Sequence, residues 1–149
     1  MAPEVFLFGV FVFLAAFNAG AMTTLQIQHY AIYPYVGKIE FIEYIRANNR
    51  AAVVPVVVPA MALLLTSVML VIDRPRFMTL GAALLAFGLN VTQLASTFIW
   101  QRRLQSEMAV SGYDEVKARR LLSTNWIRTV AFLVQALLAM TVLLRADFR

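Results

Sequence analysis

Long stretches without a charged side chain constrain the fold of this sequence more than any other feature. Three of them begin at Val5, Ala51 and Phe77 and continue to residues 37, 72 and 101. Each exceeds the roughly 20 residues that a helix needs to cross the hydrocarbon core of a membrane. A fourth stretch, 121–144, is interrupted only by Arg128, whose long side chain can reach the headgroups from near a helix end. We therefore predict an all-α fold, a four-helix transmembrane bundle in one domain, 1–149, with spans at about 5–30, 51–72, 77–101 and 121–144.

The composition agrees with this prediction and excludes several classes of function. Charged residues make up 14% of the chain, against about 25% in soluble domains. Without any cysteine there can be no disulfide, thiolate metal site or cysteine nucleophile. The net charge of +5 is explained by loops that orient a membrane protein, so the expected partner is the lipid bilayer and not nucleic acid. The acidic segment ending at Glu4 is unlike the basic start of a signal peptide, so we expect the first span to remain in the mature protein.

Basic residues are divided unevenly between the two sets of helix ends, which predicts the orientation. Nine of them are Lys38, Arg46, Arg50, Arg102, Arg103, Lys117, Arg119, Arg120 and Arg128, in or next to the first and third loops. The other four are Arg74, Arg76, Arg145 and Arg149. By the positive-inside rule, loops one and three lie in the cytoplasm and both termini lie outside it. The expected location is a bacterial inner membrane.

Two loops and one span have further features. In loop one, isoleucines at 39, 42 and 45 alternate with charged residues, which predicts a short amphipathic interfacial helix near 38–48. Loop three predicts an extension of the third helix, a turn at Ser111-Gly112 and a charged lead into the fourth helix. Pro55 and Pro59 should bend the second helix. Small residues at 16 and 20, and at 81, 88 and 95, should allow close helix contacts.

Polar side chains recur at helical spacing on three of the four predicted spans. The stripes are Asn18, Met22, Gln26, His29 and Tyr33 on the first, Asn90, Gln93, Thr97 and Gln101 on the third, and Asn125, Arg128, Phe132 and Gln135 on the fourth. Polar groups facing lipid would lack hydrogen-bond partners, so the three stripes should face inward and meet. We expect a polar pocket in the cytoplasmic half of the bundle, although such residues can also serve only to join helices.

His29 is the only histidine, and the sequence leaves three interpretations of it open. It can be an interfacial residue hydrogen-bonded beside Tyr30 and Tyr33. It can be a proton acceptor, because imidazole titrates near pH 6.5. It can be a metal or haem ligand, with Glu40 and Glu43 completing the site, but no metal-binding motif is recognisable and we predict no metal. Phosphate-binding loops and nucleophile elbows are also missing from the sequence.

The segments "LLSTNWIRT", 121–129, and "QHYAIYP", 28–34, resemble those of a largely uncharacterised family of small four-helix membrane proteins that includes the fungal anthrone oxygenases. The similarity covers the whole chain in length and layout of spans. Its specific part is the Asn125-Trp126-x-Arg128 group and the polar end of the first helix. The resemblance implies oxygenation of a lipophilic aromatic or phenolic substrate that requires no metal or flavin; whether any cofactor is bound stays open.

The resemblance also suggests roles for individual residues. His29 would take a proton from an activated carbon, and Arg128 with Asn125 would stabilise the resulting phenolate-like anion. Tyr33 and Trp126 would flank the ring of the substrate. Gln26 and Gln93 complete the substrate-binding residues that we expect from the polar stripes.

A second hypothesis belongs to a different class of function. The chain can be a non-catalytic subunit that binds a quinone, carotenoid or lipid and packs in a larger membrane complex or a homo-oligomer. Phe6, Phe13 and Phe17 on the first helix would then form an outward docking face. A transporter is disfavoured, because the sequence has neither inverted repeats nor a charged pathway through the midplane.

Overall fold

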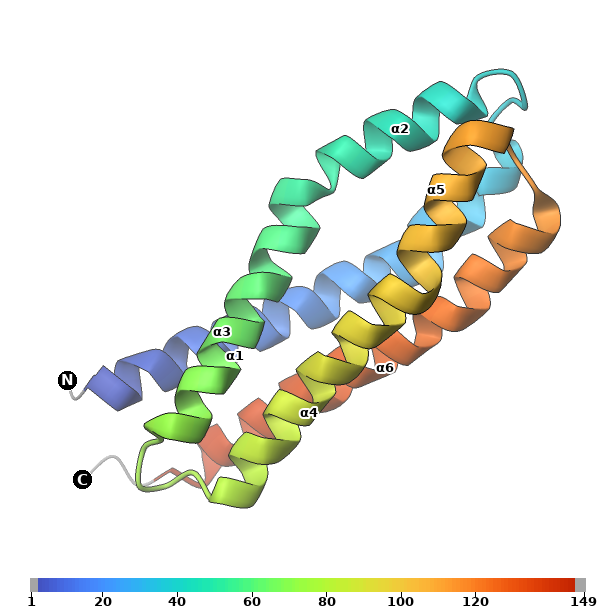
Figure 1. The fold of residues 1–149 in the computed structure, drawn as a ribbon. Coiled ribbons are helices and arrows are strands. Elements are labelled where there is room, and N and C mark those ends of the chain that lie inside the picture. Colours follow the sequence, from blue (N-terminus) through green and yellow to red (C-terminus); the bar gives the residue numbers. More distant parts are fainter. Residues whose placement is uncertain (1–2, 147–149) are drawn as a thin grey trace.

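The fold is entirely helical in the part of the chain that the computed structural model describes, residues 3–146. The α-helices are α1 (Pro3–Thr24), α2 (Phe41–Ala51), α3 (Val58–Ile72), α4 (Leu80–Ser96), α5 (Arg102–Ser111) and α6 (Glu115–Leu144). Between them lie the π-helical segments η1 (Leu25–His29), η3 (Val53–Val57) and η4 (Thr97–Gln101), and the 3₁₀ segment η2 (Tyr30–Tyr35). These elements join end to end into four long rods (Figure 1).

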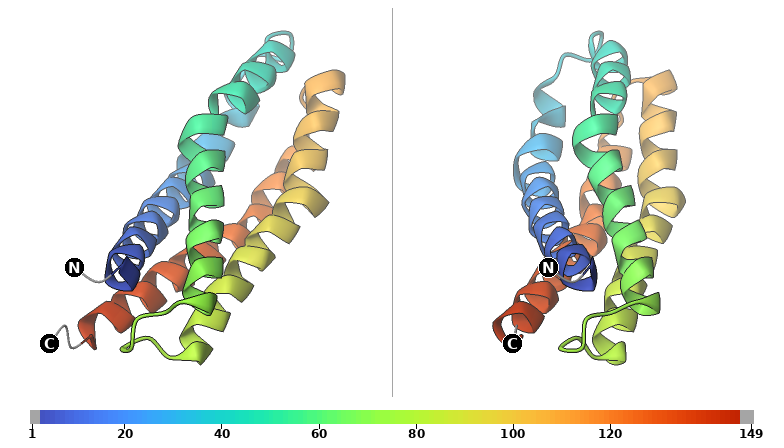
Figure 2. Two further views of the ribbon diagram at one scale, coloured as in Figure 1. Left: turned by 60° about the vertical axis from the view of Figure 1, so that its left-hand side comes forward. Right: turned by 90° about the vertical axis from the view of Figure 1, so that its left-hand side faces the viewer.

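The four rods form an antiparallel ring in which α1 contacts α3 and α6, and α4 contacts the same two helices (Figures 1 and 2). Segments long and apolar enough to cross a membrane are Pro3–Tyr35, Val53–Ile72, Leu80–Ser111 and Glu115–Leu144. The predicted all-α class and the four long helices are confirmed. The first, third and fourth helices run further toward one end than we predicted.

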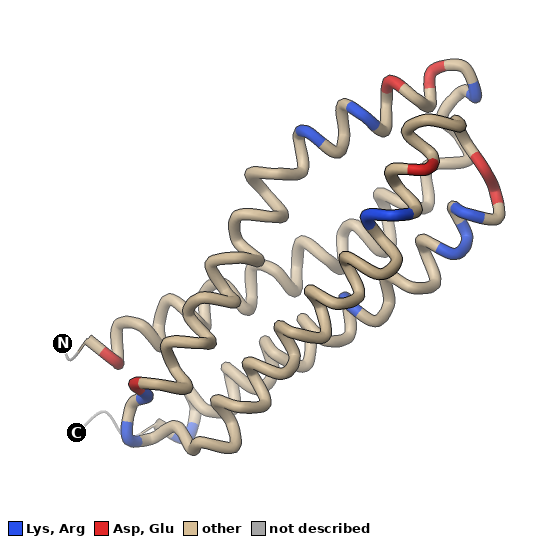
Figure 3. The backbone as a smooth tube through the Cα atoms, in the orientation of Figure 1, with Lys and Arg blue, Asp and Glu red and all other residues tan. Residues whose placement is uncertain are grey.

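That end is where the turns at 36–40 and 112–114 lie, and we call it the loop end (Figure 1). Most basic residues of the described chain gather there, whereas Arg74, Arg76 and Arg145 lie at the opposite end with both termini (Figure 3). Arg149, counted in the sequence, lies outside the described residues.

Local signals explain the turns. α5 ends at Gly112, whose φ of 83° is in the left-handed region that glycine adopts without strain. Asp114 then caps α6 by accepting a hydrogen bond from the Lys117 amide at 3.0 Å. At the opposite end, Thr79 caps α4 through the Ala82 amide at 3.2 Å. The turn and the charged lead predicted for loop three are therefore present.

The core between the rods is made by apolar residues from every helix of the ring. Phe8, Phe11, Leu63 and Phe132 are fully buried there. Small residues at 15, 19, 83 and 86 are also fully buried or nearly so and let the helices approach. The small residues that we predicted for this role, at 16, 20, 81, 88 and 95, are exposed instead. That prediction was wrong within this bundle, because each of these residues lies one or two positions away from the inward face of its helix.

The helix predicted in loop one exists, but its apolar face differs from the prediction. α2 runs through η3 into α3 as one bent rod and packs along α5 (Figure 1). Phe41 and Ile45 are its buried residues, whereas Ile39 precedes the helix and is 89% exposed. The spacing of four residues turns α2 toward α5, so its apolar side is covered by protein and is not free to lie flat on a membrane surface.

Candidate functional site

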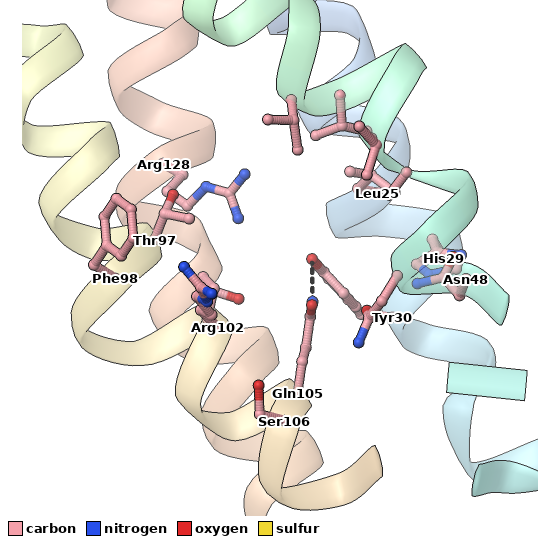
Figure 4. A pocket seen from close by; sticks show the side chains of 16 residues that line it. Leu25, His29, Tyr30, Asn48, Thr97, Phe98, Arg102, Gln105, Ser106 and Arg128 are labelled. Atoms are coloured by element: carbon pink, nitrogen blue, oxygen red, sulfur yellow. Dashed lines mark hydrogen bonds between the residues drawn. The ribbon is translucent and has the colours of Figure 1, made fainter. Parts of the chain in front are cut away.

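A cavity of about 500 Å³ lies where the ring of helices opens toward the loop end (Figure 4). η1 and η2, the rod of α2 and η3, the rod of η4 and α5, and α6 all contribute to its wall. The residues that line it are Leu25, His29, Tyr30, Asn48, Asn49, Ala52, Val53, Val56, Val57, Thr97, Phe98, Gln101, Arg102, Gln105, Ser106 and Arg128. It has the size of a small-molecule site, in which a few polar groups are placed among apolar walls.

All three π-helical segments of the described chain border this cavity. η1 contributes Leu25 and His29, η3 contributes three valines, and η4 contributes Thr97, Phe98 and Gln101. In η3 the wide turn has a sequence cause, because Pro55 cannot donate a backbone hydrogen bond. The Ala52 carbonyl accepts from the Val56 amide at 3.0 Å and also from the Val57 amide, five residues further along, at 3.3 Å. Single π-helical turns concentrate at functional sites, and their convergence here distinguishes this cavity from the rest of the molecule.

Arg128 of α6 is the charged group at the centre of the site. Its side chain is only 8% exposed, and its guanidinium points into the cavity (Figure 4). Its Nη2 donates to the Met22 sulfur at 3.4 Å, a weak acceptor, and the Tyr30 hydroxyl lies close enough to interact with it. The buried Nε has no hydrogen-bond partner within residues 3–146.

No carboxylate compensates this charge. Among the described residues that line the cavity, none is an aspartate or glutamate, and the second charged residue, Arg102, is also basic. The ion pairs found in the described chain join Arg103, Lys117 and Arg119 to glutamates near the loop end. A buried guanidinium without an anion is costly, and a negatively charged or strongly hydrogen-bonding oxygen in the cavity would offset that cost.

Gln101 adds an acceptor to the same cavity. Its amide nitrogen donates to the Thr124 hydroxyl at 3.0 Å, and its buried Oε1 has no partner within the described residues. Through this hydrogen bond Gln101 joins η4 to α6 beside the cavity.

His29 lines the cavity together with Arg128, on the opposite side of it (Figure 4). Its ring is half-buried and contacts three tyrosines, with centroid distances of 5.4 Å to Tyr30, 5.4 Å to Tyr33 and 6.3 Å to Tyr44. Its Nε2 lies 3.5 Å from the Tyr33 hydroxyl, the limit of a hydrogen bond. The imidazole is thus oriented by aromatic rings and still reaches the cavity.

Asn125 and Gln26 do not line the cavity but join the two elements that carry its charged groups. Asn125 is fully buried and donates through Nδ2 to Gln26 Oε1 at 2.8 Å. Gln26 Nε2 in turn donates to the Leu122 carbonyl at 3.1 Å. This bridge holds η1 against α6, so the geometry gives both residues a positioning role.

The other residues expected to bind substrate lie in three different places. Tyr33 is buried in the aromatic cluster with Phe41 and Tyr44, behind His29. Trp126 is 48% exposed on the outer surface and does not line the cavity. Gln93 lines a narrower space of about 90 Å³ next to the cavity and donates to Gln135 Oε1 at 3.0 Å.

Several lining residues were missed by sequence reasoning. Tyr30 points into the cavity and accepts a hydrogen bond from Gln105 Nε2 at 3.4 Å (Figure 4). Asn48 and Asn49 come from the end of α2, which we had placed at a membrane surface. Continuing the helical spacing of the third span four residues beyond Gln101 would have found Gln105, whereas on the first span the regular stripe favoured Tyr33 over Tyr30. Nothing in the sequence indicates that α2 folds back over them.

Within the described residues, no group of three His, Asp or Glu side chains is placed to hold a metal ion. Comparisons with protein-family models, with curated proteins and with solved structures find no match to this chain.

Proposed function

We propose that this chain is an integral membrane protein that crosses the bilayer four times, with the loop end in the cytoplasm. The support is the length and apolar character of the four rods, together with the concentration of basic residues at one end. The cavity then lies in the cytoplasmic half of the bundle, where polar groups can be buried in protein although the surroundings are lipid.

We further propose that the cavity binds a lipophilic phenol and oxygenates it without a metal or flavin, as the resemblance to the family of the anthrone oxygenases suggests. The observation that carries this proposal is the buried Arg128, which has an unpaired Nε and no acid lining its cavity within the described residues, with His29 on the opposite side of that cavity. A phenolic oxygen would bind to the guanidinium, and an acidic carbon of the same molecule would lie toward the imidazole.

The reaction balances with dioxygen as the only oxidant. The His29 imidazole accepts a proton from the activated CH₂ carbon of the keto tautomer, and the electron pair spreads onto the carbonyl oxygen beside Arg128, which becomes a phenolate oxygen. The carbanion gives its electrons to dioxygen, a carbon–oxygen bond forms, and the proton on His29 completes a hydroperoxide. Loss of water leaves a ketone, so one dioxygen is consumed for each ketone and each water formed.

The test is oxygen uptake by the purified protein in lipid nanodiscs with anthrone, which has a phenol tautomer and an activated CH₂ carbon. His29→Ala removes the base and should lower the rate of oxygen uptake by about 10²-fold or more. Arg128→Gln removes the charge that stabilises the anion and should lower this rate by a similar factor. Gln28→Ala and Arg120→Gln are the matched controls, because both side chains are exposed and lie on the same elements. Equal rates in all four variants, or no uptake above empty nanodiscs, would refute the reaction.

The alternative of a non-catalytic subunit has one observation in its favour. Phe6, Phe13 and Phe17 are 61%, 67% and 43% exposed, and Phe13 stacks on Phe17 with centroids 6.3 Å apart. Lipid would cover this face in a lone protein, and a partner would cover it in a complex. A photo-crosslinking amino acid at position 13 in intact membranes separates the two: a single protein adduct supports the subunit, and lipid adducts alone contradict it.

A further inference from the structure

The cavity continues past Arg128 as a narrow slot between α3 and α4. The slot is lined mainly by aliphatic side chains, Val57, Ala60, Met61 and Leu64 on one side and Leu94 on the other. Val56, Val57, Thr97 and Arg128 line both the slot and the cavity. The cavity and the slot thus meet at the buried guanidinium of Arg128. The larger cavity on one side has several polar side chains in its wall, and the smaller slot on the other side is mainly aliphatic.

Apart from Arg128, the amide side chains that line the slot donate to protein partners. Asn90 Nδ2 donates to the Ser67 hydroxyl at 3.0 Å and to the Ala86 carbonyl at 3.1 Å, and Gln93 donates to Gln135. They close the inner side of the slot and do not call for a polar ligand. A ligand in the slot would therefore contact mainly aliphatic side chains.

The slot also reaches the outer surface of the bundle. Val57, Met61 and Leu94, which line it, are 48%, 42% and 36% exposed. In the proposed orientation this surface faces the hydrocarbon chains of the bilayer. A molecule dissolved in the membrane could then move sideways between α3 and α4 and bring its polar end to Arg128 without passing through water.

We propose that the ligand is a single-chain amphiphile, a phenol that carries an aliphatic chain, which enters from the bilayer and binds with its oxygen on Arg128 and its chain in the slot. This inference rests on the proposed function for the nature of the head. Charge complementarity selects that head, because the charged residues that line the cavity in the described chain, Arg102 and Arg128, are both basic. The aliphatic lining and the small volume of the slot, about 90 Å³, favour a chain over a second ring system.

The test is photolabelling with a 4-alkylphenol that carries a diazirine near the end of its chain, added to the full chain in lipid nanodiscs. Mass spectrometry of the peptides should place the adducts on slot residues of α3 and α4. Leu64→Trp fills the slot, whereas Leu65→Trp makes the same change at the neighbouring exposed position. Slot labelling should be lost in the first variant and kept in the second. It should fall by roughly tenfold in Arg128→Gln, which removes a charge-assisted hydrogen bond.

The outcomes separate this inference from the proposed function. Labelling of the outward faces of all helices, unaffected by Leu64→Trp, would overturn it. Labelling confined to the cavity would overturn the placement of the aliphatic chain in the slot, and would leave a compact phenol as the substrate. Slot labelling that depends on Arg128, in a protein that consumes no oxygen, would support the ligand class while the oxygenation fails.

Discussion

Replacing Arg128 by methionine should make the empty protein more stable and at the same time remove its affinity for ligand. Methionine has a similar length and no charge, so it can occupy the same space beside Met22. If a side chain stabilises the fold, replacing it lowers the free energy of unfolding. If a buried charge serves only to bind a ligand, replacing it raises the free energy of unfolding of the ligand-free protein. The sign of the change therefore separates the two roles.

The magnitude follows from three contributions. Burying a guanidinium at the centre of a membrane helix costs about 2.5–3.5 kcal/mol, and the cost is smaller where the group faces a cavity that can hold water. The contacts that are lost, to the Met22 sulfur at 3.4 Å and to Tyr30, each contribute up to about 0.5 kcal/mol, below an ordinary hydrogen bond. The free energy of unfolding should thus rise by about 1 kcal/mol.

The assay is equilibrium unfolding in mixed micelles without ligand, with Arg120→Met as the control. Arg120 lies on the same helix and is exposed, so its substitution should change stability by less than about 0.5 kcal/mol. A loss of about 3–5 kcal/mol in Arg128→Met, as when one partner of a buried ion pair is removed, would refute the reasoning. It would mean that Arg128 is paired with an acid in the folded protein.

Three further predictions concern the bridge, the loop end and the orientation. Asn125→Leu should lower the free energy of unfolding by about 1–3 kcal/mol by leaving a buried Gln26 oxygen without its donor, and adding Gln26→Leu should recover part of the loss; additive losses in thermal unfolding would contradict the bridge. Burial raises the pKa of Tyr44 above its ordinary value of about 10, so its contribution to stability is present below that pH and lost as the pH rises through the raised pKa. Tyr44→Phe should flatten the alkaline loss of stability, and an unchanged pH profile would show that this group does not contribute. In whole cells an impermeant maleimide should label Arg74→Cys but reach Ser111→Cys only after lysis, and the reverse pattern would invert the orientation.

The architecture could be predicted from sequence because membrane-spanning length and helical spacing are local properties. The inward direction of the polar stripes follows from the cost of exposing such groups to lipid, and Asn18, Gln26, Gln93 and Gln135 are indeed buried. Helical spacing predicts which side chains share one face of a helix, and it correctly predicted that Arg128 lies on the inward face of the fourth helix.

The site could be predicted only in part, because its walls depend on how separate rods bend. The π-helical turns at Leu25–His29 and Thr97–Gln101 have no signal in the sequence, and each shifts the helix face that follows it. This explains why Tyr30 reaches the cavity and Tyr33 does not, although the regular spacing favoured Tyr33. Trp126 was misplaced for a simpler reason, since adjacency to Asn125 in a motif says nothing about sharing its face.

The most direct test of a ligand site at Arg128 is to identify the molecules that co-purify with the protein. The native chain and Arg128→Met would be purified in parallel from the same membranes, extracted with organic solvent and compared by mass spectrometry against Arg120→Met. We expect a lipophilic compound with an acidic oxygen, in near-stoichiometric amount, from the native protein and from Arg120→Met, and its loss from Arg128→Met. The same molecules in all three extracts, or bulk phospholipid alone in each, would contradict a ligand site at Arg128.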